Sequence, residues 1–215
     1  PLGVFAVAIA TVILPNLSRH HAASSVEAYS QTLDWALRMV LLIAIPAAAA
    51  LMLLAEPILA TLFLYGEVMT PRDMSMATLS LRAYSLGLVA FMLIKVLAPG
   101  FFARQDMRTP VRIGVIAMVS NMVLNLILVI PLHFYWQVGH VGLALATSLS
   151  AFLNALLLFL ALRSKAIYLP GRAWLRFMVT LLLAVILMVA TLIWLGDQFD
   201  AFDASLWQQL GWWQR

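Results

Sequence analysis

The chain has 215 residues, of which 64% are hydrophobic and only 10% are charged, and its formal net charge is +4. A soluble domain is roughly half apolar and a quarter charged, so this chain has too few polar residues to cover a soluble surface. Disorder is excluded because it requires low hydrophobicity, and the absence of cysteine excludes disulfides and thiolate metal sites. The composition predicts an integral membrane protein whose apolar exterior faces lipid.

The chain begins in a short apolar stretch, residues 2–14, without the basic start or the cleavage site of a signal peptide. About 13 helical residues extend ~20 Å, which is less than the ~30 Å hydrocarbon core of a bilayer. We therefore expect half of a transmembrane helix here and a chain that is a fragment of a longer protein.

Five full membrane spans are predicted after it. Each is continuously apolar over about 20 residues, the length that a transmembrane helix needs, whereas barrel strands would alternate over ~10 residues. The spans are residues 36–55, 83–103, 113–132, 141–162 and 177–195. The predicted fold class is an all-α polytopic transmembrane bundle of half a helix plus five full spans, in a single membrane domain over residues 1–215.

Interfacial segments are predicted at two places. In residues 15–34, the apolar Val26, Tyr29 and Leu33 recur at helical spacing, which predicts an amphipathic helix lying on the membrane surface. After the last span, Trp207, Trp212 and Trp213 predict an interfacial segment, because aromatic residues gather at the membrane–water boundary.

The connector over residues 56–80 contains a helix start signal. Thr70 is predicted as the N-cap and Pro71 as the first helical residue. The second full span would then begin well before its apolar run, and Arg82 would lie on this helix near the interface.

The basic residues predict the orientation of the chain. Alternate connectors and the adjoining span ends hold nine of them: Arg19, Arg38, Arg104, Arg108, Arg112, Arg163, Lys165, Arg172 and Arg176. The opposite side holds Arg72 and Arg215 together with most of the acids, so the basic side is cytoplasmic. The basic pI of about 9.9 is thus a topology signal that needs no nucleic acid. Binding to anionic lipid headgroups is compatible with the same pattern.

Two cations lie within or beside the spans. A charge at the centre of a membrane helix costs roughly 2.5–3.5 kcal/mol on insertion scales. Lys95 lies nearer the cytoplasmic end, so it could extend to the interface or face a polar cavity. Arg38, at a span end, is expected to extend to the interface.

Uncharged polar residues also interrupt the apolar spans. Asn121 and Asn125 are four residues apart and share a helix face; Ser120, Thr147, Ser148, Ser150 and Asn154 are the others. Such groups either bond neighbouring helices or line a transport cavity. Pro46 and Pro99-Gly100 are predicted to interrupt their helices, as occurs in transporters and in kinked membrane helices alike.

Residues for enzyme chemistry are sparse. His20 and His21 are adjacent on a helix, so their side chains diverge by about 100° and would need a third ligand to hold a metal. His133 and His140 flank an aromatic loop and are expected to belong to an interfacial belt. No catalytic residue, metal site or cofactor is predicted.

Residues 95–112, KVLAPGFFARQDMRTPVR, resemble the signature of the MurJ (MviN) lipid II flippases, in the multidrug/oligosaccharidyl-lipid/polysaccharide exporter superfamily. Residues 3–20 are similar to the eighth helix of that family and the loop after it, and residues 142–158 to the twelfth. The resemblance implies a partial C-terminal lobe, about helices 8–13 of 14, in the bacterial inner membrane. The main cavity charges of the family would lie upstream of residue 1.

The resemblance implies transport of lipid II, the undecaprenyl-pyrophosphate-linked peptidoglycan precursor, from the inner to the outer leaflet by alternating access. It implies no catalysis, and it implies lipid II, membrane lipids and cell-wall synthesis proteins as partners. Candidate substrate or gating residues are Lys95, Arg104, Asp106, Arg108, Asn121 and Asn125, and the structural motif is Pro99, Gly100, Thr109 and Pro110. Pro110 is expected at the first position of the next helix, with Asp106 close to its positive end.

Two rival functions remain. A polysaccharide-lipid flippase or drug antiporter of the same superfamily is disfavoured by the 95–112 motif. A transferase acting on polyprenyl phosphates would need clustered acids for Mg²⁺ near the cytoplasmic face, where Glu27, Asp34 and Asp106 are widely separated in sequence.

Overall fold

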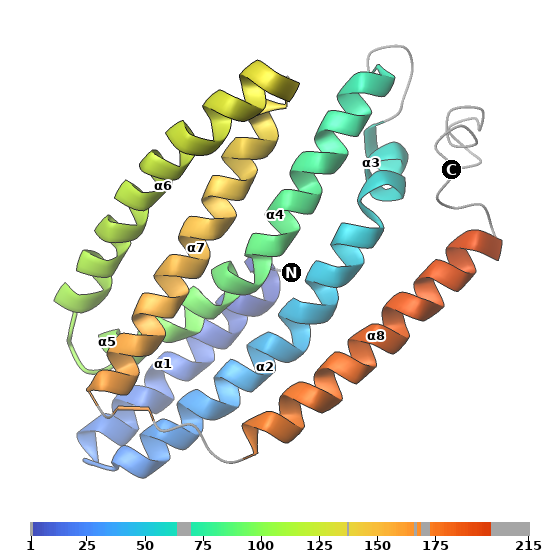
Figure 1. Cartoon of the computed structure of the whole chain (residues 1–215). Helices are drawn as coiled ribbons and strands as arrows, with labels where there is room; N and C mark the ends of the chain where they lie inside the picture. Colours follow the sequence, from blue (N-terminus) through green and yellow to red (C-terminus); the bar gives the residue numbers. More distant parts are fainter. Residues whose placement is uncertain (1, 64–69, 137, 166, 169–172, 199–215) are drawn as a thin grey trace.

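A computed structural model describes residues 2–63, 70–136, 138–165, 167–168 and 173–198. These residues form a bundle of helices without strands (Figure 1). In chain order the elements are η1 (Leu2–Ala6), α1 (Val7–Ala22), α2 (Val26–Leu53), α3 (Ala55–Phe63), α4 (Pro71–Leu97), α5 (Pro99–Phe102), α6 (Arg108–Trp136), α7 (Gly139–Ser164) and α8 (Trp174–Gln198). The predicted all-α class is confirmed.

Six helical segments of the described chain are long and apolar enough to cross a membrane. Three of them contain the predicted spans 113–132, 141–162 and 177–195, and two overlap the spans 36–55 and 83–103 but end one or two residues before them. The sixth, Leu2–Ala22, is also long enough, because the helix continues through Pro15 beyond the apolar stretch. The helix is therefore longer than the half span that hydropathy alone predicted.

The predicted surface helix over residues 15–34 is not a separate element. Its first part continues α1 and its last part begins α2, and only residues 23–25 turn between them. The helical spacing was informative in part, because Tyr29, Leu33 and Leu37 are buried, whereas Val26 is 58% exposed. This apolar stripe packs against neighbouring helices instead of lipid headgroups.

Prolines have different effects in the two helices where interruptions were predicted. Pro46 does not interrupt α2, which is helical from Val26 to Leu53; in this respect the prediction was wrong. Pro99 does mark a boundary, since α4 ends at Leu97 and Pro99 opens the short helix α5. A proline suits a first helical position because its missing N–H has no acceptor there.

The predicted start of α4 is confirmed in detail. The Thr70 hydroxyl accepts the Asp73 N–H at 3.2 Å, and the Asp73 carboxylate accepts the Thr70 N–H at 3.1 Å. This reciprocal capping box satisfies two backbone donors that a helix start leaves free. Arg82 lies on the same helix and donates from Nε to the carbonyl oxygen of Met52 at 3.2 Å.

Small residues allow the central helices to approach closely. A Cβ on Gly87 of α4 would lie 2.6 Å from the Ser148 Oγ of α7. That hydroxyl donates to the Ala83 carbonyl at 2.8 Å, which joins the two helices. A Cβ on Gly142 of α7 would lie 3.1 Å from the backbone of α6. Close packing of this kind stabilises helix bundles in lipid, where no hydrophobic effect drives the helices together.

Helix α8 lies at the side of the bundle, along α2 and apart from α6 and α7 (Figure 1). Its side chains are largely exposed, as expected for a surface covered by lipid; Leu187, for example, is 69% exposed. The predicted interfacial segment with Trp207, Trp212 and Trp213 lies outside the described residues.

Candidate functional site

A cavity of about 470 Å³ opens among η1, α4, α6 and α7. Its apolar lining includes Leu2 and Phe91. Its polar lining comprises Lys95, Asn121, Thr147, Ser150 and Asn154. These polar residues come from α4, α6 and α7. Each was noted separately in the sequence as a polar residue within an apolar span, and the cavity brings them together.

Lys95 lies at this cavity, in the last turn of α4. It is exposed and forms no ion pair with any described residue. Lys95 thus lines a cavity whose other polar residues come from α6 and α7. An unpaired cation within a membrane helix is costly, which makes it a candidate for contact with an anionic substrate.

The opposite wall of the cavity is a chain of hydrogen bonds between α6 and α7. Asn125 donates from Nδ2 to the Asn121 Oδ1 at 3.1 Å, and Asn121 donates to the Ser150 Oγ at 3.2 Å. Ser150 in turn donates to the Thr147 carbonyl at 2.9 Å. Asn154, also at the cavity, has a buried amide oxygen without a hydrogen-bond partner among the described residues. The wall thus joins two helices.

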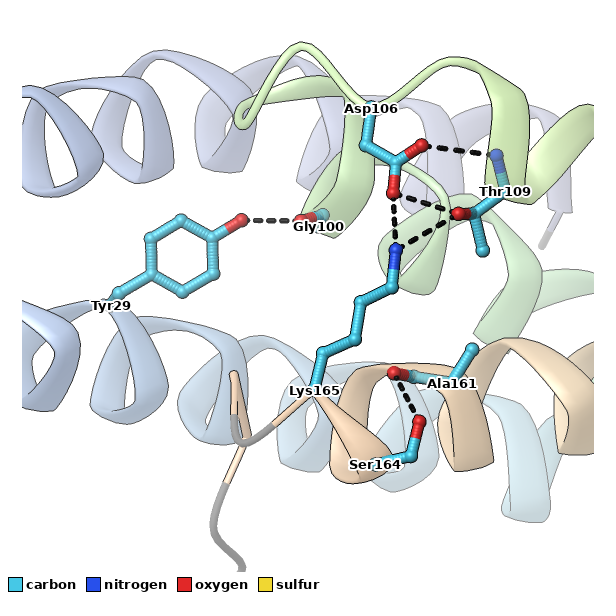
Figure 2. Close-up of polar contacts among 7 residues, drawn as sticks. All are labelled: Tyr29, Gly100, Asp106, Thr109, Ala161, Ser164 and Lys165. Atoms are coloured by element: carbon cyan, nitrogen blue, oxygen red, sulfur yellow. Dashed lines mark hydrogen bonds and ion pairs between the residues drawn. The ribbon is translucent and has the colours of Figure 1, made fainter.

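The 95–112 motif leads from the cavity to one end of the bundle. This end holds the turn between α1 and α2, the connector after α5 and the end of α7, and we call it the connector end. Pro99 and Gly100 are buried, and the Gly100 carbonyl accepts a hydrogen bond from the Tyr29 hydroxyl of α2 (Figure 2). Helix α6 begins at Arg108, two residues before the predicted start, so Pro110 lies within the first turn and not at its first position. A proline is tolerated there because the N–H groups of the first turn have no intrahelical acceptor.

Asp106 is the centre of a polar network at this end (Figure 2). Its carboxylate accepts the Thr109 N–H at 3.0 Å and the Thr109 hydroxyl at 2.7 Å, and it pairs with the Lys165 Nζ at 2.6 Å. The hydrogen bond from Lys165, followed by those from Thr109, holds the pKa of Asp106 well below its usual range. Asp106 therefore stays charged, stabilises the start of α6 and ties it to the end of α7.

Arg104 and Arg108 are not part of the Lys95 cavity. Arg104 is exposed and lines a separate pocket beside His20 and His21, and Arg108 is exposed at the start of α6. The predicted candidates thus divide into two groups. Lys95 and Asn121 line the cavity, with Asn125 bonded behind Asn121, while Arg104, Asp106 and Arg108 lie at the connector end.

A second network at the connector end was missed in the sequence. Asp34 pairs with Arg38 at 2.8 Å, accepts the Tyr168 hydroxyl at 2.7 Å and accepts the indole N–H of Trp174. Burial raises the pKa of the Tyr168 phenol, and the bond to Asp34 raises it further. The i,i+4 spacing of Asp34 and Arg38 was a signal for the ion pair, but the two aromatic partners carry no local signal.

Arg38 has partners that the sequence did not predict. Its guanidinium lies 5.4 Å from the centre of the Trp174 ring and 5.8 Å from that of Phe177, in addition to the Asp34 pair. Arg38 therefore packs between helices α2 and α8, and its extension to the interface stays a prediction.

The histidines give no metal centre in the described part of the chain, where no three His, Cys, Asp or Glu side chains come together. His133 makes an edge-to-face contact with Phe134, at 5.8 Å between ring centres.

A polytopic helix bundle with a cation-bearing cavity between its helices is an architecture found in membrane transporters. More specifically, the chain belongs to the lipid II flippase MurJ family, whose family model matches residues 1–206. The family and the six spanning helices place it in the bacterial inner membrane as a multi-pass protein.

Curated relatives agree with the family match. The chain is 51% identical over 197 residues to a protein named "Probable lipid II flippase MurJ" from Vibrio cholerae, with 92% of this chain and 36% of the relative covered. It is 42% identical over 200 residues to "Lipid II flippase MurJ" from Burkholderia cenocepacia, with 93% of this chain and 37% of the relative covered. The chain thus spans little more than a third of the length of these relatives.

A solved structure titled "Lipid II flippase MurJ, inward closed conformation" has the same fold. It superposes with a TM-score of 0.76 at 24% sequence identity, over 99% of this chain and 42% of that chain. At this identity the match is evidence for the fold.

Proposed function

We propose that this chain is part of a lipid II flippase, which moves the undecaprenyl-pyrophosphate-linked precursor from the inner to the outer leaflet by alternating access. The observation that carries the proposal is the family match over residues 1–206. On the register implied by the 95–112 motif, the chain is a partial C-terminal lobe, about helices 8–13 of 14. The protein is not an enzyme on this proposal, because the substrate changes leaflet and no covalent bond changes.

The cavity supplies what such a substrate needs. The headgroup of lipid II is large, polar and anionic, and it must cross the membrane without entering hydrocarbon. Lys95 offers a cation that no described carboxylate neutralises. Asn121, Ser150 and Asn154 offer hydrogen-bonding groups along the opposite wall. We infer that this surface is one side of the substrate pathway, with the undecaprenyl tail remaining in lipid.

Contacts at the connector end hold neighbouring helices together. Asp106 joins the start of α6 to Lys165 at the end of α7, and Asp34 joins α2 to Tyr168 and Trp174. The first contact joins two of the helices that line the cavity, α6 and α7, and the second joins α2 to the segment around the start of α8. A rigid lobe of this kind suits alternating access, in which two lobes rock around a central site. Membrane lipids and cell-wall synthesis proteins are the other partners that we expect.

Depletion of the full-length protein in its host tests the proposed function. Lipid II should become inaccessible to an impermeant lipid II-cleaving enzyme added outside the inner membrane, and re-expression should restore cleavage. A variant with Asn121 and Asn154 both changed to Leu should restore less cleavage than the wild type at equal protein level. Normal cleavage after depletion would contradict the proposal, and accumulation of another lipid-linked saccharide would favour the polysaccharide-lipid flippase instead.

A further inference from the structure

A second pocket, of about 210 Å³, lies at the connector end of the bundle. It is formed where α1 ends, α2 begins and the connector after α5 passes beside them. Its polar lining consists of His20, His21, Ser24, Ser25, Tyr29 and Arg104. It shares no lining residue with the Lys95 cavity. The substrate pathway proposed above does not use it.

The charge of this pocket is not neutralised by the protein. No Asp or Glu lines it, and Arg104 forms no ion pair with any described residue. The neighbouring cations Arg38 and Lys165 do have carboxylate partners, Asp34 and Asp106 respectively. Arg104 therefore presents an unpaired guanidinium, a planar fork of donors that matches the oxygen atoms of a phosphate.

The two histidines are also free to bind a ligand. At the end of α1 the carbonyls of Arg19, His20 and His21 accept the backbone N–H groups of Ala23, Ser25 and Ser24. The helix end is thus closed by backbone bonds at 2.9–3.1 Å, and the imidazoles are not needed to cap it. They make no hydrogen bond to the described residues, so their ring N–H groups remain available as donors. A metal ion is the poorer ligand because Arg104 would repel it.

We propose that this pocket binds a phosphate group at the cytoplasmic face of the membrane. The pocket lies on the basic side of the chain, where both anionic lipid headgroups and soluble phosphates are within reach. Arg104 supplies the charge, His20 and His21 supply ring donors, and the Ser24 and Ser25 hydroxyls complete a polar lining. Binding there joins α1, α2 and the connector after α5 through one ligand.

The test measures binding of phosphatidylglycerol to the full-length protein in detergent, with phosphatidylcholine as the zwitterionic reference and inorganic pyrophosphate as the soluble probe. The Arg104→Gln variant and the double variant His20→Gln/His21→Gln should each weaken anion binding about tenfold. Arg163→Gln removes an exposed charge at the same end but outside the pocket, and it should change binding less than twofold. Thermal unfolding confirms that each variant is folded.

The same binding measurements show whether the phosphate belongs to a lipid or to a soluble molecule. Displacement of phosphatidylglycerol by pyrophosphate indicates a site open to soluble phosphates, whereas preference for the lipid in the presence of pyrophosphate indicates a headgroup site. Equal losses in the Arg104 and Arg163 variants would overturn the proposal, because they would show only general attraction of anions to a basic surface. The proposal would also be overturned if the wild type bound phosphatidylglycerol no more tightly than phosphatidylcholine and did not bind pyrophosphate. Lipid II transport is measured separately, so its failure would leave this result interpretable.

Discussion

Two lysines of this chain differ in what surrounds them. Lys165, at the connector end, pairs with the Asp106 carboxylate at 2.6 Å and donates to the Thr109 hydroxyl at 3.0 Å (Figure 2). Lys95 lies at a polar cavity within the membrane-spanning bundle and has no carboxylate partner among the described residues. A charge that the protein neutralises stabilises the fold, and a charge that it leaves unpaired is available to a substrate.

The same contrast separates the two regions as a whole. The connector end joins distant segments through two carboxylates, Asp34 and Asp106, each of which accepts several hydrogen bonds. The cavity wall contains Lys95 and amides, and the buried amide oxygens of Asn125 and Asn154 have no hydrogen-bond partner among the described residues. Variants at the connector end should therefore reduce stability, and variants at the cavity should reduce transport.

The largest effect on stability is expected for Asp34→Ala. Asp34 accepts hydrogen bonds from Arg38, Tyr168 and Trp174, and its side chain is only 19% exposed. Its removal leaves these three donors, one of them a partly buried guanidinium, without their acceptor, at a cost of about 2–3 kcal/mol. Thermal unfolding of the purified protein measures the loss. Glu27→Ala, an exposed acid on the same helix, is the matched control; equal shifts in the two variants would contradict the structural role of Asp34.

The Asp34 network also shows where prediction from sequence ends. Hydropathy locates the membrane spans because lipid requires long apolar helices, and the capping box at Thr70 and Asp73 is recognisable because its partners are three residues apart. Asp34 instead meets Tyr168 and Trp174 across 134 and 140 residues of chain. No local pattern carries a contact of that kind, since it depends on how α2 packs against the segments around α8.

Only part of the cavity could be predicted from the sequence. Lys95, Asn121 and Asn154 each stand out in an apolar span, so their types mark them individually. That they face one space follows only from the packing of α4 and α6 against α7, where Gly87 and Gly142 permit close approach. A polar residue in a membrane helix therefore marks either a helix contact, as at Ser148, or a site, and the helix packing decides which.

Lys95→Met should reduce transport about tenfold, equivalent to ~1.4 kcal/mol in the barrier, with little change in unfolding temperature. The variant keeps an unbranched side chain, one atom shorter, and removes the charge at the cavity. Lys165→Met is the comparison: it should lower the unfolding temperature and leave transport per folded molecule within about twofold. The measurement is lipid II accessibility in the outer leaflet of cells that depend on the variant. Full activity of the Lys95 variant would show that this lysine only extends to the interface.

The smallest effect is expected for Asp106→Asn, which should cost less than about 1 kcal/mol because the side chains of Lys165 and Asp106 are 46% and 27% exposed and solvent screens the pair. The folded-state pKa of Asp106 is depressed, chiefly by Lys165. Its contribution is therefore complete above the usual carboxyl pKa of about 4 and is lost as the pH falls through that value toward the folded pKa.

The difference in unfolding temperature between the wild type and the Asp106→Asn variant should accordingly be constant from pH 7 to about pH 5 and shrink below about pH 4. A difference that stayed constant into acid would mean that Asp106 acts through its hydrogen bonds to Thr109, which an amide partly replaces, and not through its charge. Lys165 would then differ less from Lys95, because its ion pair with Asp106 would contribute little to the stability of the fold.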